Sequence, residues 1–176
     1  MYAVILCFDQ QVEAAVRAIW RELADKQISD YAAQVRERKP HITLASFDGL
    51  ENVSDLVLDL EQFCKEISRF AVTFSSVGSF LRSGTVYLSP VLSSELYQCH
   101  ARVYERLTVS ADSLYSPGKW IPHMTLANYL AEDELPAAFA LCQNQAQLEG
   151  RAVEIQLIKI QKDKQVQVVY QANFQE

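Results

Sequence analysis

Residues 40–47 read Pro-His-Ile-Thr-Leu-Ala-Ser-Phe, and residues 122–129 read Pro-His-Met-Thr-Leu-Ala-Asn-Tyr. The two stretches share proline, histidine, threonine, leucine and alanine in the same order, and an aromatic residue closes each of them. They contain two of the only three histidines in the chain. One short motif often arises by chance, but two matched copies indicate an internal duplication.

The segments that precede the two stretches repeat as well. An apolar run at 2–8 comes before the first stretch and another at 85–91 comes before the second, and both are typical of strands. A helical pattern follows each run, and Asp9 and Ser93 stand where they can cap these helices. The apolar positions of the two patterns are Val12, Val16, Ile19 and Leu23 in the first half and Leu96, Cys99, Val103 and Leu107 in the second.

A second helix and a further strand are predicted after each His-x-Thr segment. Alternation of apolar and polar residues predicts strands at 70–77 and 153–160, and one additional strand at 166–174. Pro136 fits the first turn of the second helix in the second half. The helical apolar positions are Leu56, Leu60, Phe63 and Ile67 in the first half and Leu135, Phe139 and Cys142 in the second.

Each half therefore reads strand, helix, strand, helix, strand, which predicts an α+β fold built from a duplicated unit. The length of 176 residues and the absence of a linker-like segment suit one domain. We expect a single bilobal domain at 1–176, with one repeat at about 1–80 and the other at about 84–176. Two copies of one unit commonly lie about a pseudo-twofold axis, so we expect two lobes with mainly antiparallel sheets around one central cleft.

Side-chain alternation along the two His-x-Thr strands predicts where their chemistry lies. His41 and Thr43 project from one face of the first strand, and His123 and Thr125 project from the equivalent face of the second. We expect this polar face to line the cleft and the opposite face to pack in the core. The residues predicted on that apolar face are Ile42, Leu44, Met124 and Leu126.

The residues around these four complete the predicted cleft. Strict alternation puts the small Ala45 and Ala127 next on the polar face, where they leave room for a ligand. Arg36, Arg38 and Lys39 lead into the first motif, and Lys119 and Trp120 lead into the second, so cations and an indole approach the cleft at equivalent points. We interpret Lys39, Lys119 and Trp120 as candidate substrate-binding residues, by phosphate attraction and base stacking; a solvated basic loop and an indole that anchors the strand are the alternative.

Two facing histidines suit a reaction that needs a general base and a general acid. An unperturbed imidazole pKa of roughly 6.5 allows one ring to be neutral while the other is protonated. Phosphodiester cleavage is such a reaction, because one proton leaves the attacking group and another reaches the departing oxygen. Thr43 and Thr125 can then donate hydrogen bonds to the phosphoryl oxygens, where charge gathers in the transition state.

The paired motifs resemble those of the two-histidine phosphoesterase superfamily, which contains bacterial 2′,5′-RNA ligase-like proteins and cyclic phosphodiesterases. The opening run at 2–6 resembles the family's first strand, and 77–80 followed by 85–88 resembles its mid-chain Gly-x-Phe turn and next strand. The resemblance implies that His41 and His123 act as acid and base. It also implies that Thr43 and Thr125 hold the phosphate.

Metal and cofactor chemistry are not expected. The chain has only three histidines, its cysteines are not clustered, and the resemblance implies a reaction without metal. The four cysteines are expected to be reduced and mostly buried. His100, the third histidine, is expected to lie partly exposed on a helix flank, outside the site.

Charge and composition restrict the partners. The net charge is −6, so the chain as a whole repels nucleic acid, and we expect no long duplex as a ligand. Many ligase-like members have a basic residue after the second motif, whereas this chain has Asn128 and Tyr129, which favours small substrates. With no apolar run long enough to span a membrane and no signal peptide, we expect a cytoplasmic monomer without a membrane partner.

The function predicted from the sequence is hydrolysis of 2′,3′-cyclic phosphate ends of RNA or of small nucleotides. One alternative within enzymes is joining or cleavage of 2′-5′ linkages in RNA, because the family members act on different bonds. An alternative of another class is a non-catalytic nucleotide-binding regulatory module, which loss of one histidine would favour. A purely structural domain would instead bury both motifs among apolar side chains.

Overall fold

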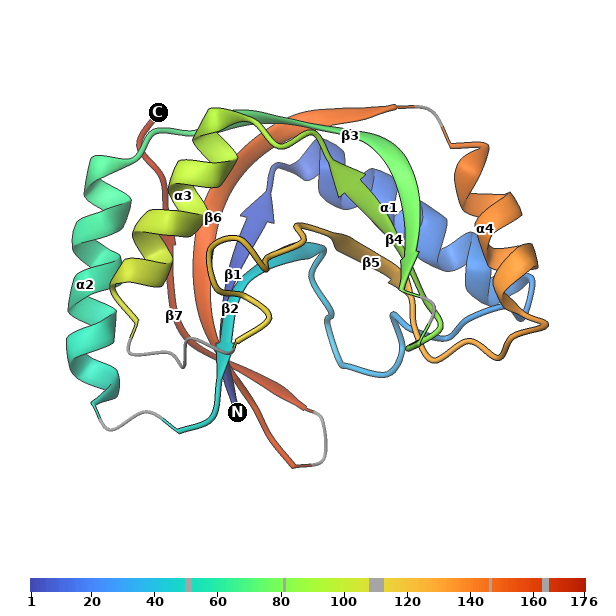
Figure 1. The fold of residues 1–176 in the computed structure, drawn as a ribbon, viewed down its shortest axis with the longest axis horizontal. Helices are drawn as coiled ribbons and strands as arrows, with labels where there is room; N and C mark the ends of the chain where they lie inside the picture. The colour runs from blue at the N-terminus through green and yellow to red at the C-terminus, as the bar shows by residue number, and fades with distance from the viewer. Residues whose placement is uncertain (50–51, 81, 108–112, 146, 163–164) are drawn as a thin grey trace.

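The structure is a computed structural model, and it describes the chain except residues 50–51, 81, 108–112, 146 and 163–164 (Figure 1). The predicted order of strands and helices in each half is confirmed. The elements are β1 (Tyr2–Phe8), α1 (Gln10–Asp25), β2 (His41–Phe47), α2 (Val53–Glu66), β3 (Phe70–Phe80), β4 (Thr85–Pro90), α3 (Ser94–Glu105), β5 (Met124–Ala127), α4 (Leu135–Gln143), β6 (Leu148–Ile160) and β7 (Val166–Asn173).

The first helix of each half begins at the predicted cap. The Asp9 carboxylate accepts a hydrogen bond from the Val12 backbone N–H at 3.0 Å, and the Ser93 hydroxyl accepts one from the Leu96 N–H at 3.2 Å. Both bonds satisfy a backbone donor that the helix itself cannot pair. Asp9 makes one bond more, because its second oxygen accepts from the Arg151 N–H at 2.7 Å and so ties the start of α1 to β6.

The two halves exchange a strand. The antiparallel sheet has seven strands in the order β2-β1-β6-β3-β4-β5, and β7 pairs with β6. The last strand of the first repeat, β3, lies beside β4 of the second repeat, while β6 of the second repeat lies beside β1 of the first. The strand orders β2-β1-β6 and β5-β4-β3 are therefore equivalent, as a pseudo-twofold arrangement requires.

Helices cross between the halves in the same way. Figure 1 shows α2 and α3 at one end of the arched sheet and α1 and α4 at the other. The helix α1 of the first repeat contacts β5 of the second, and α3 of the second repeat contacts β2 of the first. Each His-x-Thr strand is therefore packed against a helix from the other half.

Both His-x-Thr strands carry a β-bulge at the same motif position. The register of β2 with β1 shifts at Leu44, and the register of β5 with β4 shifts at Leu126. A bulge interrupts the alternation of side chains, so each leucine and the alanine after it are buried together. The prediction that Ala45 and Ala127 line the cleft is therefore wrong, because both are fully buried.

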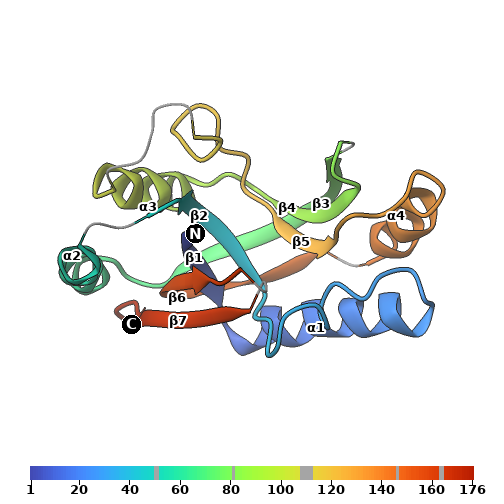
Figure 2. The ribbon, with the colours of Figure 1, turned by 90° about the horizontal axis from the view of Figure 1, so that it is seen from below.

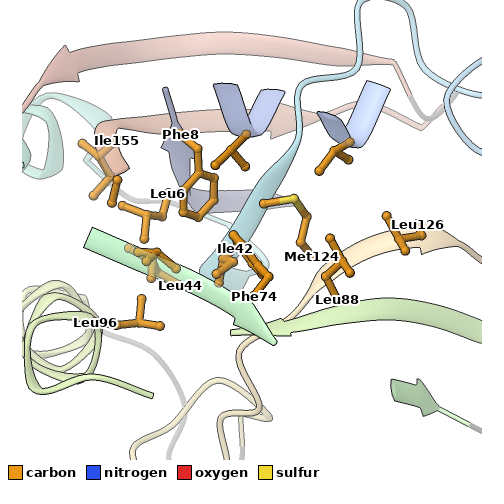
Figure 3. Close-up of a cluster of buried hydrophobic side chains, with 14 of the residues drawn as sticks. Leu6, Phe8, Ile42, Leu44, Phe74, Leu88, Leu96, Met124, Leu126 and Ile155 are labelled. Atoms are coloured by element: carbon orange, nitrogen blue, oxygen red, sulfur yellow. The ribbon is translucent and has the colours of Figure 1, made fainter. Parts of the chain in front are cut away.

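The apolar face predicted for the two motif strands lies in the core (Figure 3). The side chains Ile42, Leu44, Met124 and Leu126 are each completely buried. They pack with residues of β1, β3 and β6, among them Leu6, Phe74 and Ile155. All four cysteines are free and buried, as predicted.

In the part of the chain that the structure describes, we find no helix with the length and apolar character needed to cross a bilayer.

The duplicated caps permit a matched comparison of stability. Asp9→Ala removes an acceptor for two backbone N–H groups, whereas Ser93→Ala removes an acceptor for one. We expect Asp9→Ala to lower the free energy of unfolding by about 2 kcal/mol and Ser93→Ala by about 1 kcal/mol. Urea unfolding of both variants measures the difference, and an equal or larger loss in Ser93→Ala would contradict it.

Candidate active site

The two His-x-Thr segments meet where β2 and β5 approach each other (Figure 2). His41 is the first residue of β2, and His123 directly precedes β5. Both side chains are half-buried, and so are Thr43 and Thr125. The imidazoles are close enough that the charge of His123 lowers the pKa of His41. The predicted pairing of the two motifs in one place is therefore observed.

Each imidazole is held in one orientation by a backbone carbonyl two residues upstream. Nδ1 of His41 lies 2.7 Å from the Lys39 carbonyl oxygen, and Nδ1 of His123 lies 2.8 Å from that of Ile121. A carbonyl oxygen only accepts, so Nδ1 carries the proton in both rings. In each neutral ring Nε2 is then the acceptor, which is the state that a general base needs.

Burial favours the neutral form of both histidines. It lowers the pKa of His41 to about 4, and the positive charges of Arg38 and His123 act in the same direction, while the Lys39 carbonyl opposes them. Burial also lowers the pKa of His123, against the effect of the Ile121 carbonyl. Near pH 7 both imidazoles of the free protein are therefore neutral.

Aromatic side chains pack against His123. The ring centroid of Phe80 lies 4.9 Å from that of His123, with the rings nearly perpendicular, and the Tyr87 centroid lies 5.3 Å away. Tyr87 reaches this place across Gly78, its pairing partner in the sheet, where a Cβ atom would stand 2.5 Å from the tyrosine ring. Gly78 lies inside β3, so the turn expected at 77–80 is instead a strand that supports His123.

An indole from the opposite half holds the backbone of each motif threonine. Trp20, on α1, donates its Nε1–H to the Thr125 carbonyl oxygen at 3.2 Å. Trp120 donates its Nε1–H to the Thr43 carbonyl oxygen at 2.9 Å. Both bonds join one repeat to the other, so each half of the molecule positions the His-x-Thr strand of the other half.

A tyrosine from the opposite half also faces each threonine side chain. Tyr31 lies near Thr125 and Tyr115 lies near Thr43, close enough that each threonine acts to lower the pKa of the neighbouring phenol. Burial raises the pKa of both phenols, so both keep their protons over the working pH range. Neither tyrosine is predicted from the sequence, although each stands in the segment just before a motif.

Trp120 anchors strand β2 through its hydrogen bond to the Thr43 carbonyl oxygen. One face of its indole stacks on His100, with ring centroids 3.9 Å apart and planes 2° from parallel. His100 is only 1% exposed, contrary to the expectation of a partly exposed histidine. Its Nε2 lies 2.8 Å from the Tyr115 carbonyl oxygen, so His100 holds both Trp120 and the loop that carries Tyr115.

The two lysines proposed as substrate contacts differ in their surroundings. The Nζ atom of Lys39 lies 2.7 Å from Glu154 Oε1, so this cation is already paired with a carboxylate of β6. Lys119 is exposed in the loop before the second motif. Arg38, another cation that leads into the first motif, lies closer to the site: its guanidinium carbon lies 3.9 Å over the Tyr31 ring, and its charge acts on His41.

A groove of about 510 Å³ opens beside His41. Arg38 and Lys162 contribute cations to its lining, and no aspartate or glutamate is among the described residues that line it. Asn128 and Tyr129, which follow the second motif, form part of its wall, and the Tyr129 side chain is 73% exposed. A larger hollow of about 640 Å³, lined by α2, β3 and α3 residues, contains neither motif.

The site thus presents two neutral imidazoles, two hydroxyls and a cationic groove. Among the described residues, no three His, Cys, Asp or Glu side chains gather as a metal centre would require. The groups present can remove a proton, deliver a proton and donate hydrogen bonds to an anion. Such a set is suited to acid–base chemistry on a phosphate ester.

The comparison with known families gives one match. The family described as the 2′-5′ RNA ligase superfamily matches residues 8–164, a stretch that contains both motifs. No curated protein sequence matches the chain.

Solved structures share the fold at low sequence identity. Escherichia coli LigT complexed with 3′-AMP has a TM-score of 0.64 and 13% identity, over 99% of this chain and 98% of that one. Escherichia coli LigT complexed with NADP+ has a TM-score of 0.66 and 14% identity, over 99% and 98%. The TT0787 protein of Thermus thermophilus has a TM-score of 0.63 and 14% identity, over 98% and 97%.

The packing around His123 leads to a test by titration. In Gly78→Ala the new methyl group displaces the Tyr87 ring, which then covers His123 less completely. We expect the pKa of His123 to rise toward its ordinary value, because burial is the main cause of its depression. NMR titration of the imidazole measures this shift.

Gly118→Ala is the control, because a Cβ atom there meets no atom within 4 Å. Gly118 has a positive φ, so the substitution strains the backbone without disturbing Tyr87. An unchanged His123 titration in Gly78→Ala, or an equal shift in both variants, would contradict the role of Gly78.

Proposed function

The chain belongs to the 2′-5′ RNA ligase superfamily, and on that premise we propose that it hydrolyses 2′,3′-cyclic phosphate ends of RNA or small nucleotides without a metal ion. The observation that carries the proposal is the pair of neutral imidazoles, each fixed at Nδ1 by a carbonyl and each left with an acceptor at Nε2. Each ring can take up a proton at Nε2, so one ring can act as the base and the other, once protonated there, as the acid.

In the proposed reaction, a water molecule attacks phosphorus and one imidazole accepts its proton. The other imidazole protonates the ribose oxygen as the phosphorus–oxygen bond breaks, so one water is consumed and one phosphate monoester forms. Both imidazoles of the free protein are neutral near pH 7, so the acid gains its proton when the anionic substrate binds and raises the pKa of the nearby ring. Thr43 and Thr125 donate hydrogen bonds to the phosphoryl oxygens.

The groove beside His41 supports a small nucleotide as the substrate. Its volume of about 510 Å³ suits one nucleotide, and Arg38 and Lys162 supply positive charge in a protein whose net charge is −6. The exposed ring of Tyr129 offers a face on which a base can stack. The complex of Escherichia coli LigT with 3′-AMP supports a nucleotide ligand by analogy.

Joining of 2′-5′ linkages in RNA is the second candidate, favoured by the name of the superfamily. It is the same chemistry run in reverse, with a ribose hydroxyl as the attacking group. Incubation of the protein with 2′,3′-cyclic nucleotides, cyclic-ended RNA and 2′-5′ oligoadenylate, with separation of the products, decides between hydrolysis and ligation.

The histidines are tested by substitution. We expect His41→Ala and His123→Ala each to lower kcat by about 100-fold or more, because each removes one member of an acid–base pair. The double variant should be little worse than either single variant, since both groups act in one step. Assays in EDTA, with melting temperatures as the control for folding, make the test. Near-normal turnover in either single variant, or loss of wild-type activity in EDTA, would contradict the mechanism.

The depressed pKa values predict an acidic optimum. The profile of kcat/KM follows the free protein, so its acid limb should lie near pH 4 and its alkaline limb below about 6.5. The two limbs belong to the coupled pair. Arg38→Ala should move the acid limb to higher pH, because it removes a positive charge that lowers the pKa of His41.

Arg36→Ala is the matched control for that shift, because Arg36 is exposed and stands two positions away in the same loop. Its profile should coincide with that of the wild type. An optimum above about pH 7.5, or equal shifts in both arginine variants, would show that burial and Arg38 do not set the titration of the pair.

A further inference from the structure

The groove beside His41 shares a wall with another hollow, which lies between the end of α1 and the start of α4. This α1–α4 hollow has a volume of about 460 Å³. Gln34, Asn128 and Tyr129 line both the groove and the α1–α4 hollow. Figure 1 shows α1 and α4 at the same end of the molecule. A ligand that fills the groove therefore reaches the α1–α4 hollow at the shared wall.

The groove and the α1–α4 hollow have opposite charges. Arg38 and Lys162 line the groove, whereas Asp30 and Glu134 line the hollow. The described residues that line the hollow include no lysine or arginine. A phosphate is attracted to the groove and repelled by the hollow, while an uncharged base with N–H donors suits carboxylates. A nucleotide bound at the shared wall is therefore oriented with its phosphate beside His41 and its base toward the hollow.

The chain holds Tyr129 rigidly at this wall. Its backbone has a φ of 56°, in the left-handed region that costs free energy for a residue with a side chain. The Tyr129 N–H donates to the Ser83 carbonyl at 3.1 Å, and the Leu130 N–H donates to the Gly84 carbonyl at 3.0 Å. The side chain is 73% exposed, so a base can stack on its ring at the junction of groove and hollow.

A hydrogen bond between Gln34 and Asp30 determines which groups the hollow offers to that base. Gln34 Nε2 donates to Asp30 Oδ1 at 2.9 Å, so the amide nitrogen is turned toward the carboxylate. Gln34 Oε1 and Asp30 Oδ2 are the acceptors that this bond does not use. The pair therefore suits a base edge that carries two neighbouring donors.

Guanine has such an edge, because its N1–H and its 2-amino group are adjacent. Adenine and cytosine place an amino donor beside a ring acceptor, and uracil has one N–H between two carbonyl oxygens. Enzymes that act on single nucleotides commonly recognise a base by hydrogen bonds to this edge. The acceptors of Asp30 and Gln34 complement guanine better than any of the other three bases.

We propose that Asp30 and Gln34 recognise guanine, so that the preferred substrates are guanosine 2′,3′-cyclic phosphate and RNA ends that carry it. The two acceptors receive the N1–H and 2-amino hydrogens, and the base stacks on Tyr129. The cyclic phosphate then lies beside His41. This inference rests on the proposed function, because it names the substrate of that reaction.

Hydrolysis of a series of 2′,3′-cyclic nucleotides tests the preference. In the wild type, kcat/KM should be about 10-fold higher for guanosine than for adenosine or uridine. Inosine lacks the 2-amino group, so its value should be about 3- to 10-fold below that of guanosine. Asp30→Asn should remove most of the guanosine advantage and leave adenosine unchanged, because an amide replaces the charged acceptor. Gln34→Met should also reduce the advantage, since it removes the second acceptor.

Asp25→Asn is the matched control. Asp25 is exposed at the end of α1 and does not line the hollow, so the variant has the same change in net charge without touching the base. It should keep the full preference for guanosine. A wild type that favours adenosine or uridine, an unchanged preference in Asp30→Asn, or an equal loss in both variants would overturn the proposal. Melting temperatures check that each variant is folded.

The same variants are compared by calorimetry in their affinity for 3′-GMP and 3′-AMP, which needs no turnover. A preference for 3′-GMP that Asp30→Asn removes, without any hydrolysis, would refute the proposed function and leave the recognition of guanine supported. Hydrolysis without a base preference would do the reverse. A protein that neither binds nor hydrolyses these nucleotides would contradict both.

Discussion

Two indole hydrogen bonds, from Trp20 to the Thr125 carbonyl and from Trp120 to the Thr43 carbonyl, join the halves of the molecule at the motif strands. Both acceptor residues directly precede the bulges at Leu44 and Leu126, where pairing with the neighbouring strand is interrupted. The exchange of β3 and β6 brings the donor of one half to the acceptor of the other. The geometry of the site therefore depends on contacts that neither repeat contains alone.

The two histidines occupy equivalent positions of the duplicated fold but have different neighbouring side chains. Both rings have the same carbonyl bond at Nδ1, but His41 opens to a groove with Arg38 and Tyr129, whereas Phe80 and Tyr87 pack against His123. A symmetric scaffold with unequal surroundings is what a reaction with distinct acid and base requires, because the two groups must hold their protons at different stages. The pseudo-twofold symmetry places the two histidines together, and their different neighbours give them different surroundings.

Local patterns in the sequence predicted the elements of the fold well. The caps Asp9 and Ser93, the strand periodicity and the repeated motif depend on neighbours along the chain, and the structure confirms them. The bulges, the exchanged strands and the stack of His100 on Trp120 depend on residues far apart in sequence, so periodicity could not reveal them. Tyr31 and Tyr115 were missed for the same reason, since each lies near a threonine of the opposite half.

Central to the proposed mechanism are two fixed imidazoles that act on one bond of a bound cyclic phosphate. Hydrolysis of 2′,3′-cyclic AMP in water enriched in oxygen-18, followed by phosphorus NMR of the product, tests this claim most directly. We predict a single phosphate monoester isomer with one oxygen-18 on phosphorus, because fixed acid and base positions select one ring bond. A mixture of the 2′ and 3′ monoesters in comparable amounts, or no product at any pH, would contradict it.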